Sequence, residues 1–145
     1  MNLVVDANVV VKWYVDERDS EQARRVLAAP GRIISPGHAL GEIGEVLTRR
    51  VRARDIGREQ LDLALDDMLL RLAFVPLGAI AEDAIGVALE AKVSFYDALH
   101  IALASVLEVP VVTADEVLVR ALAGTRWSTQ IIPLAEWPAQ TQARQ

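Results

Sequence analysis

The sequence predicts an α/β fold with a parallel sheet at its centre and helices on the faces of that sheet. Short apolar runs alternate along the chain with longer segments whose apolar residues recur at helical spacing. Proline and glycine turn signals separate these segments, as at Pro30-Gly31 and Pro36-Gly37. Hydrophobic residues make up 52% of the chain and charged residues 24%, a composition typical of a globular protein with a buried core.

The N-terminal half begins with the apolar run LVV, which predicts a strand over residues 3–5. A helix over residues 20–29 is expected to end at the first Pro-Gly turn, and a strand over 32–35 at the second. The helix over 39–52 carries an apolar stripe at helical spacing, made by Leu40, Ile43, Leu47 and Val51. A further helix, over 58–72, follows Gly57, and no helix is predicted before residue 20.

The C-terminal half continues the same alternation. It predicts strands over residues 74–77, 109–113 and 130–133, and helices over 80–92, 97–107 and 116–123. Gly78 and Gly124 fall between these elements, as turn residues do. The helix over 97–107 is apolar nearly all round, which predicts a central position in the fold.

Length and composition limit what the protein can be. Residues 1–137 are expected to form a single domain, and residues 138–145, rich in Gln and Ala, a flexible tail. The chain has no cysteine, which excludes disulfides and thiolate metal sites and fits a reducing compartment. No secretion signal and no apolar run of about 18 residues are visible, so we expect a cytoplasmic protein without a membrane partner.

The net charge of −5 means that any nucleic-acid role depends on a local basic patch. One such cluster occurs at the end of the helix over 39–52 and just beyond it: Arg49, Arg50, Arg52, Arg54 and Arg58. It is a candidate for binding RNA phosphates, but a solvated helix end that attracts cations explains it equally well. Trp13 and Tyr14 could stack on bases, although packing in the core or in a dimer is the simpler explanation.

Four acidic residues occur at strand ends or in the first turns of the helices that follow. Asp6 ends the first strand, and a carboxylate in such an apolar run either caps a turn or binds a cation. Asp115 follows VPVVT, where it has the position of a helix N-cap, a role compatible with metal binding. Asp97 forms a capping-box pattern with Ser94, yet it also opens the buried helix.

Glu42 is the fourth of these residues, and it flanks the apolar stripe of its helix. A solvated surface acid is the alternative explanation for it. Gly41 and Gly44 beside it cost about 1 kcal/mol each against alanine in a helix interior, so we expect something to approach that backbone closely. Glu116, next to Asp115, would point along its helix, so we do not expect it to join these four acids.

A parallel sheet would bring the four acids to one edge, where open α/β sheets bind their ligands. Two carboxylates about 4 Å apart repel by about 4 kcal/mol at an effective dielectric constant near 20. Such a cluster needs raised pKa values or a divalent cation, and oxygen ligands suit Mg²⁺ or Mn²⁺. The pattern therefore indicates phosphoryl chemistry.

Four motifs of the chain resemble, in order and spacing, those of the PIN-domain ribonucleases, and specifically the VapC-type toxins of toxin-antitoxin pairs. They are VVDANVVVKW, SPGHALGEIGEVLTRR, FYDALHIALA and VVTADEVLVRAL, and the resemblance covers about residues 2–134. It implies a three-layer α/β/α sandwich around about five parallel strands, commonly dimeric. It also implies a type II toxin inhibited by a cognate antitoxin, whose basic segment would suit the negative net charge.

The resemblance also implies roles for individual residues. Asp6, Glu42, Asp97 and Asp115 match the acidic quartet that binds one or two Mg²⁺ or Mn²⁺ ions and activates a water to cut RNA. Asn8 and Thr113 match neighbouring polar positions that orient the ligands. The expected products carry a 5′-phosphate and a 3′-hydroxyl.

Three alternatives remain open at this point. His38 and Glu42, with Asp97 and His100, could describe a carboxylate-histidine iron or manganese enzyme, since each pair shares a helix face. A phospho-acceptor receiver would need a lysine on its last strand, and neither Lys12 nor Lys92 fits. A PIN-like module that only binds RNA or protein is disfavoured by the acids present at all four positions.

Overall fold

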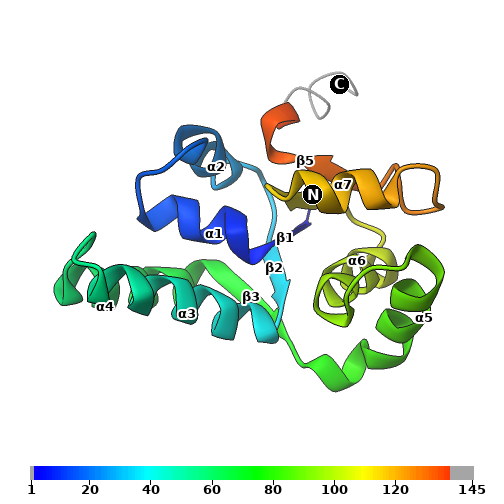
Figure 1. Ribbon diagram of the computed structural model, residues 1–145, viewed down its shortest axis with the longest axis horizontal. Coiled ribbons are helices and arrows are strands. Elements are labelled where there is room, and N and C mark those ends of the chain that lie inside the picture. The colour runs from blue at the N-terminus through cyan, green and yellow to red at the C-terminus, as the bar shows by residue number, and fades with distance from the viewer. Residues whose placement is uncertain (1, 138–145) are drawn as a thin grey trace.

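The computed structural model, which describes residues 2–137, contains a five-stranded parallel sheet in the order β3-β2-β1-β4-β5 (Figure 1). The strands are β1 (Leu3–Val5), β2 (Ile33–Pro36), β3 (Leu72–Val75), β4 (Val111–Thr113) and β5 (Ile131–Pro133). The predicted parallel sheet of about five strands is therefore confirmed. All five strands start and end within about three residues of the predicted positions.

Helices cover both faces of this sheet and complete the three layers. They are α1 (Ala7–Tyr14), α2 (Ser20–Val26), α3 (His38–Arg52), α4 (Arg58–Arg71), α5 (Ala81–Ala91), α6 (Phe95–Leu107) and α7 (Glu116–Leu122), with short 3₁₀ turns η1 (Leu77–Ala79) and η2 (Leu134–Glu136). Side chains of α1 to α4 form one core with alternate strand residues such as Val5 and Val112. Those of α5 to α7 form the second with Val4 and Val111.

Helix α1 was missed by the sequence analysis. Its sequence, ANVVVKWY, is rich in β-branched valine, which favours strands over helices. In the structure Val9, Val10 and Val11 are all buried, and Trp13 donates a hydrogen bond from Nε1 to the carbonyl oxygen of Ala23 at 2.8 Å. Burial against α2 and α3 therefore outweighs the intrinsic preference of these residues.

The described chain gives no support to one expectation about α3 and contradicts another. A Cβ atom on Gly41 or Gly44 would meet nothing within 4 Å outside the helix's own backbone, so no part of the described chain requires a glycine there. Leu40 is exposed rather than part of the apolar stripe, and Ala39 takes its place beside Ile43 and Leu47. The core stripe of α3 is thus shifted by one residue at its N-terminal end.

Strand β3 starts two residues earlier than predicted, because α4 ends at Arg71 and the chain becomes extended at Leu72. Pro76 follows the strand. The predicted tail over residues 138–145 lies outside the described residues. Among residues 2–137, no helix has both the length and the apolar character needed to cross a membrane.

Candidate active site

The four acids identified in the sequence line one pocket at the carboxyl edge of the sheet. Asp6 connects β1 to α1, Glu42 lies in α3 after β2, Asp97 is in the first turn of α6, and Asp115 precedes α7 after β4. The remaining lining residues are Ala7, Asn8, Val11 and Val46. The pocket measures about 190 Å³, below the usual range for organic cofactors, but it has room for metal ions and their water ligands.

Asp6 is buried and is held by two polar neighbours. The hydroxyl of Thr113 donates a hydrogen bond of 2.8 Å to Asp6 Oδ2, and Asn8 Nδ2 donates one of 3.3 Å to the same oxygen. Asn8 is itself positioned because its Oδ1 accepts a hydrogen bond of 3.0 Å from the backbone amide of Ala114. Asp6 occupies the N-cap position of α1, but its side chain accepts no capping hydrogen bond from that helix. Its carboxylate therefore does not cap α1.

Asp115 serves as a helix cap and also lines the pocket. Its Oδ1 accepts hydrogen bonds from the backbone amides of Val117 at 2.9 Å and Leu118 at 3.1 Å. Its own backbone amide donates to Thr113 Oγ1 at 3.0 Å. The capping that sequence suggested for Asp115 is thus present, and it fixes the carboxylate at the pocket. Glu116 is exposed and is absent from the pocket lining.

Asp97 has an environment that disfavours its charge. Burial is the main cause that raises the pKa of its carboxyl, and the negative charges of Asp6 and Asp115 raise it further. A hydrogen bond with Ser94 and the proximity of His100 act in the opposite direction. Ser94 also caps α6 by accepting a hydrogen bond from the Asp97 amide at 3.1 Å, which is the serine half of the predicted capping box.

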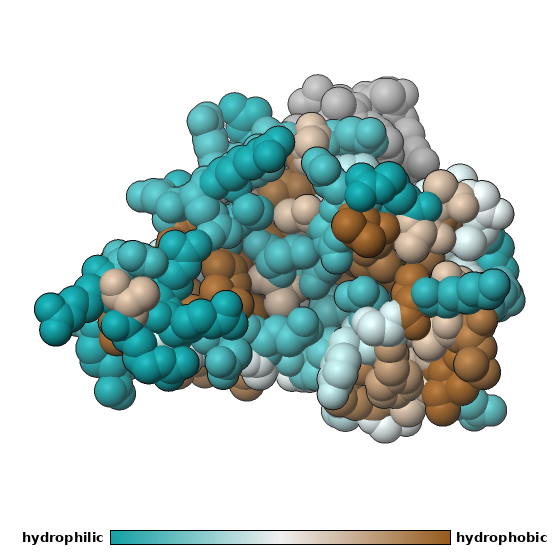
Figure 2. Space-filling view, viewed as in Figure 1, coloured by the Kyte–Doolittle hydropathy of each residue, from teal (hydrophilic) through white to brown (hydrophobic). Residues whose placement is uncertain are grey.

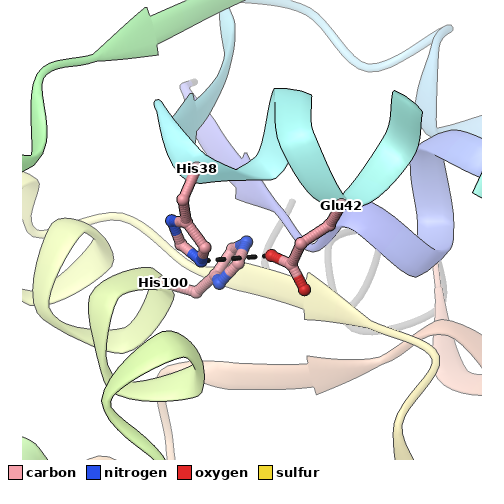
Figure 3. A group of neighbouring side chains, drawn as sticks. All are labelled: His38, Glu42 and His100. Atoms are coloured by element: carbon pink, nitrogen blue, oxygen red, sulfur yellow. Dashed lines mark ion pairs between the residues drawn. The ribbon is translucent and has the colours of Figure 1, made fainter. Parts of the chain in front are cut away.

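Glu42 lies beside a pair of histidines that belong to α3 and α6 (Figure 3). Its side chain is 45% exposed, and its Oε1 lies 3.1 Å from His38 Nε2. This contact is the main cause that lowers the pKa of Glu42, against burial, which raises it. His100 Nε2 lies 3.6 Å from Asp6 Oδ1. The i,i+4 spacing of His38 and Glu42 signals their contact in the sequence, whereas the approach of His100 to Asp6 depends on the fold.

The basic cluster lies at the far end of α3 and around its junction with α4, where Figure 2 shows mostly hydrophilic side chains. Three of its five members are paired: Arg50 with Glu17 and Asp55, Arg52 with Glu45 at 4.0 Å, and Arg58 with Asp62 at 3.0 Å. Arg49 and Arg54 are exposed and form no ion pair among the described residues. None of the five lines the acidic pocket.

The two aromatic residues considered for base stacking have structural contacts instead. Trp13 is buried in the core, so its ring is not available to a base. Tyr14 is half-buried, and its hydroxyl donates a hydrogen bond of 2.8 Å to Asp67. Burial and this hydrogen bond raise the pKa of Tyr14 far above its usual value. Core packing, the simpler of the two explanations, is correct for Trp13.

Comparisons with known proteins agree with this architecture. The family model described as PIN domain matches residues 3–123. A protein named Ribonuclease VapC3, from Pyrobaculum aerophilum, is 29% identical over 121 residues, which cover 81% of this chain and 92% of the relative.

Two solved structures have similar folds. PAE2754 from Pyrobaculum aerophilum superimposes with a TM-score of 0.67 at 19% identity, covering 99% of this chain and 96% of that one. A toxin-antitoxin complex from Klebsiella pneumoniae contains a chain that superimposes with a TM-score of 0.64 at 17% identity, covering 91% of this chain and 97% of that one. At these identities the likeness concerns the fold.

Proposed function

The chain belongs to the PIN domain family, and on that premise we propose that it is a metal-dependent endoribonuclease, the toxin of a type II toxin-antitoxin pair. The observation that carries the proposal is the convergence of Asp6, Glu42, Asp97 and Asp115 on one small pocket. The similarity to a protein named as a ribonuclease supports RNA as the substrate. A substrate of this kind and the absence of cysteine fit action in the cytoplasm.

The donor set fits Mg²⁺ or Mn²⁺. Four carboxylates supply only oxygen atoms, and the charges of Asp6 and Asp115 are among the causes that raise the pKa of Asp97, as expected where acids converge. Asp6, Glu42, Asp97 and Asp115 are the residues that would hold the ion. When bound, the ion polarises the scissile phosphate and lowers the pKa of a water molecule.

The chain's own contribution is to hold these ligands in place. Thr113 and Asn8 fix the orientation of Asp6, and the capping contacts of Asp115 fix its carboxylate, so neither has to be ordered when RNA binds. Val11 and Val46 form apolar walls beside the carboxylates, which strengthens electrostatic interactions in the pocket. Arg49 and Arg54 are available to contact RNA phosphates away from the pocket.

Replacing Asp6 by Asn tests the proposal. The substitution keeps the size of the side chain and removes its charge, so we expect Mg²⁺- or Mn²⁺-dependent RNA cleavage to fall at least about 100-fold. Asp66→Asn is the matched control, because Asp66 is an exposed acid of α4 outside the pocket. Cleavage that persists in the Asp6 variant, or that continues in excess chelator, would contradict the proposal.

An antitoxin and a second copy of the chain are the proposed protein partners. The similar fold found within a toxin-antitoxin complex supports the first, and the net charge of −5 suits a basic antitoxin segment. We expect a neighbouring reading frame to encode a small DNA-binding protein with a basic tail, and its coexpression to relieve toxicity. Toxicity that persists on coexpression would contradict this assignment.

A further inference from the structure

Two histidines with little exposed side-chain surface lie beside the acidic pocket and are not among the residues that line it. The side chain of His38, at the start of α3, is 9% exposed, and that of His100, in the middle of α6, is 2% exposed. Their ring centroids are 4.8 Å apart. Figure 3 shows both imidazoles and the carboxylate of Glu42 gathered between the two helices.

Within residues 2–137, three nitrogen atoms of these rings form no hydrogen bond, and two of the three face a carboxylate oxygen. His38 Nδ1, His38 Nε2 and His100 Nε2 are buried and form no hydrogen bond among the described residues. His38 Nε2 is close to Glu42, but the alignment is not that of a hydrogen bond. An unsatisfied buried polar group costs about 1–3 kcal/mol, so three in one place require an explanation.

The tautomer of His100 indicates what kind of partner its free nitrogen atom requires. Its Nδ1 lies 3.3 Å from the carbonyl oxygen of Tyr96, which can only accept, so Nδ1 carries the hydrogen atom in the neutral ring. The lone pair is then on Nε2, which faces Asp6 Oδ1 at 3.6 Å. The lone pair and the carboxylate repel each other, and a cation bound between them would turn this repulsion into attraction. A hydrogen bond from the other ring nitrogen to a backbone carbonyl is also the usual support of a metal-bound histidine.

We propose that His38, Glu42 and His100 form a binding site for a transition metal ion of the Zn²⁺ type, adjacent to the hard-cation site. One ligand atom from each of these residues lies within 4.8 Å of the others. Tetrahedral Zn²⁺ with ligands at about 2.0–2.1 Å requires separations of about 3.3 Å, so small side-chain rotations complete the site. Two imidazoles and one carboxylate favour Zn²⁺ over Mg²⁺, which prefers oxygen ligands.

Glu42 belongs to both the acidic pocket and this histidine site. Zn²⁺ held by the histidines would take one carboxylate from the Mg²⁺ or Mn²⁺ site, so Zn²⁺ inhibits cleavage at concentrations that fill the histidine site. This consequence, unlike the binding itself, rests on the proposed nuclease function.

Metal binding to tag-free protein tests the site without relying on activity. We expect about one Zn²⁺ per chain by calorimetry, and visible absorption bands of a nitrogen-ligated, four-coordinate ion when Co²⁺ is added. His38→Gln and His100→Gln should each weaken Zn²⁺ binding at least about 100-fold. Asp97→Asn is the matched control, since it removes a carboxylate of the acidic pocket but no ligand of the histidine site, and it should change Zn²⁺ affinity less than about tenfold.

The Zn²⁺ affinities of these variants distinguish binding at the histidine site from binding in the acidic pocket. Zn²⁺ affinity that is unchanged in the histidine variants, or lost equally in Asp97→Asn, would overturn the proposal by placing the ion among the acids. Because His100 is in the core, circular dichroism of each variant checks the fold, and His38→Gln decides the result if His100→Gln unfolds. If the wild type cleaves no RNA but binds Zn²⁺ through the histidines, the nuclease proposal fails and the histidine site stands.

Discussion

At the scale of single residues, Thr113 connects two of the acids through one hydroxyl group. Its Oγ1 donates to Asp6 Oδ2 and accepts from the backbone amide of Asp115. The side chain is almost fully buried, so water cannot replace these contacts. The orientation of Asp6 and the start of the loop before α7 therefore depend on the same oxygen atom.

Replacing Thr113 by Val keeps the shape of the side chain and removes the hydroxyl. We expect the free energy of unfolding to fall by about 1–3 kcal/mol, because Asp6 and the Asp115 amide lose a buried partner. We also expect cleavage to fall about 10- to 100-fold, because the orientation of Asp6 is lost. Urea unfolding and initial rates of RNA cleavage measure the two effects. Thr113→Ser is the control, and if it lost as much activity as Thr113→Val, the hydroxyl would not be the cause.

Asp97 is expected to destabilise the metal-free protein at neutral pH. Its pKa is raised above the ordinary value of 3.8, so the folded state disfavours the charged form that predominates at pH 7. Asp97→Asn should therefore stabilise the metal-free protein at pH 7 by a few tenths to about 1 kcal/mol, as expected for a partly exposed group. The gain should disappear as the pH falls below about 3.8, where the carboxyl is neutral in both states.

Urea unfolding in chelator at pH 7 and at pH 3.5 measures this effect, with Asp66→Asn as the control. A variant that is less stable than the wild type at pH 7 would contradict the prediction, as would an equal gain at both pH values. The same substitution removes a proposed metal ligand, so stability and cleavage should change in opposite directions.

Some contacts of the candidate site were predictable from the sequence, and others were not. The placement of the acids was predictable because three of them follow a strand directly or occupy the first turn of a helix, and parallel strands share one carboxyl edge. The contact of His100 with Asp6 was not predictable, because it depends on how α6 packs against β1. Spacing along one helix reveals neighbours on that helix and carries no information about such contacts between elements.

At the scale of elements, Asp115 caps α7 and is also a proposed metal ligand. Asp115 caps the helix through the amides of Val117 and Leu118. Asp115→Ala should therefore cost about 1 kcal/mol of stability, whereas Asp115→Asn should keep the cap and most of the stability. Both variants should lose metal-dependent cleavage, because both remove the charge.

Urea unfolding and cleavage assays on the two Asp115 variants distinguish these roles. If Asn destabilised the protein as much as Ala, the carboxylate charge rather than the capping hydrogen bonds would stabilise α7. If the Asn variant cleaved RNA at the wild-type rate, Asp115 would have only the structural role. The pair of substitutions thus separates two explanations that the sequence left compatible.

Helix α1 is the α-helix of the described residues that the sequence did not predict. Its three consecutive valines have the composition of a strand, and only burial between the sheet, α2 and α3 selects the helix. The other helices were predicted because their apolar residues recur at helical spacing between turn signals. This failure matters for the candidate site, because Asn8 and Val11 line the pocket and both belong to α1.

At the scale of the whole molecule, the fold class followed from the alternation of apolar runs and helical segments. Strand order did not follow from the sequence, since the order β3-β2-β1-β4-β5 depends on packing between distant elements. This order puts β1 in the middle, so that Asp6 lies between the ends of β2 and β4. The central strand therefore supplies the most buried acid of the pocket.

The surface over α5 is the proposed contact between two copies of the chain. Ile85 and Leu89, one turn apart on α5, are 52% and 76% exposed. Figure 2 shows hydrophobic side chains gathered on this side of the molecule. The exposed leucines of α4, such as Leu70, are instead interleaved with six charged residues of the same helix: Arg58, Glu59, Asp62, Asp66, Asp67 and Arg71. α5 itself carries three charged residues, Glu82, Asp83 and Glu90, and the last of these pairs with Arg126. A surface with fewer charges is the more favourable to bury in an interface.

We therefore expect the protein to be a dimer at about 50 µM in sedimentation equilibrium, a concentration at which micromolar association is largely complete. The double substitution Ile85→Glu, Leu89→Glu should produce monomers, because the interface would then bury four unpaired carboxylates per dimer. Leu70→Glu, which adds a charge to α4, should leave the dimer intact. Circular dichroism checks that each variant is folded. A dimer that survives the double substitution, or that dissociates with Leu70→Glu, would place the contact elsewhere, because a carboxylate disrupts association only where the interface buries it.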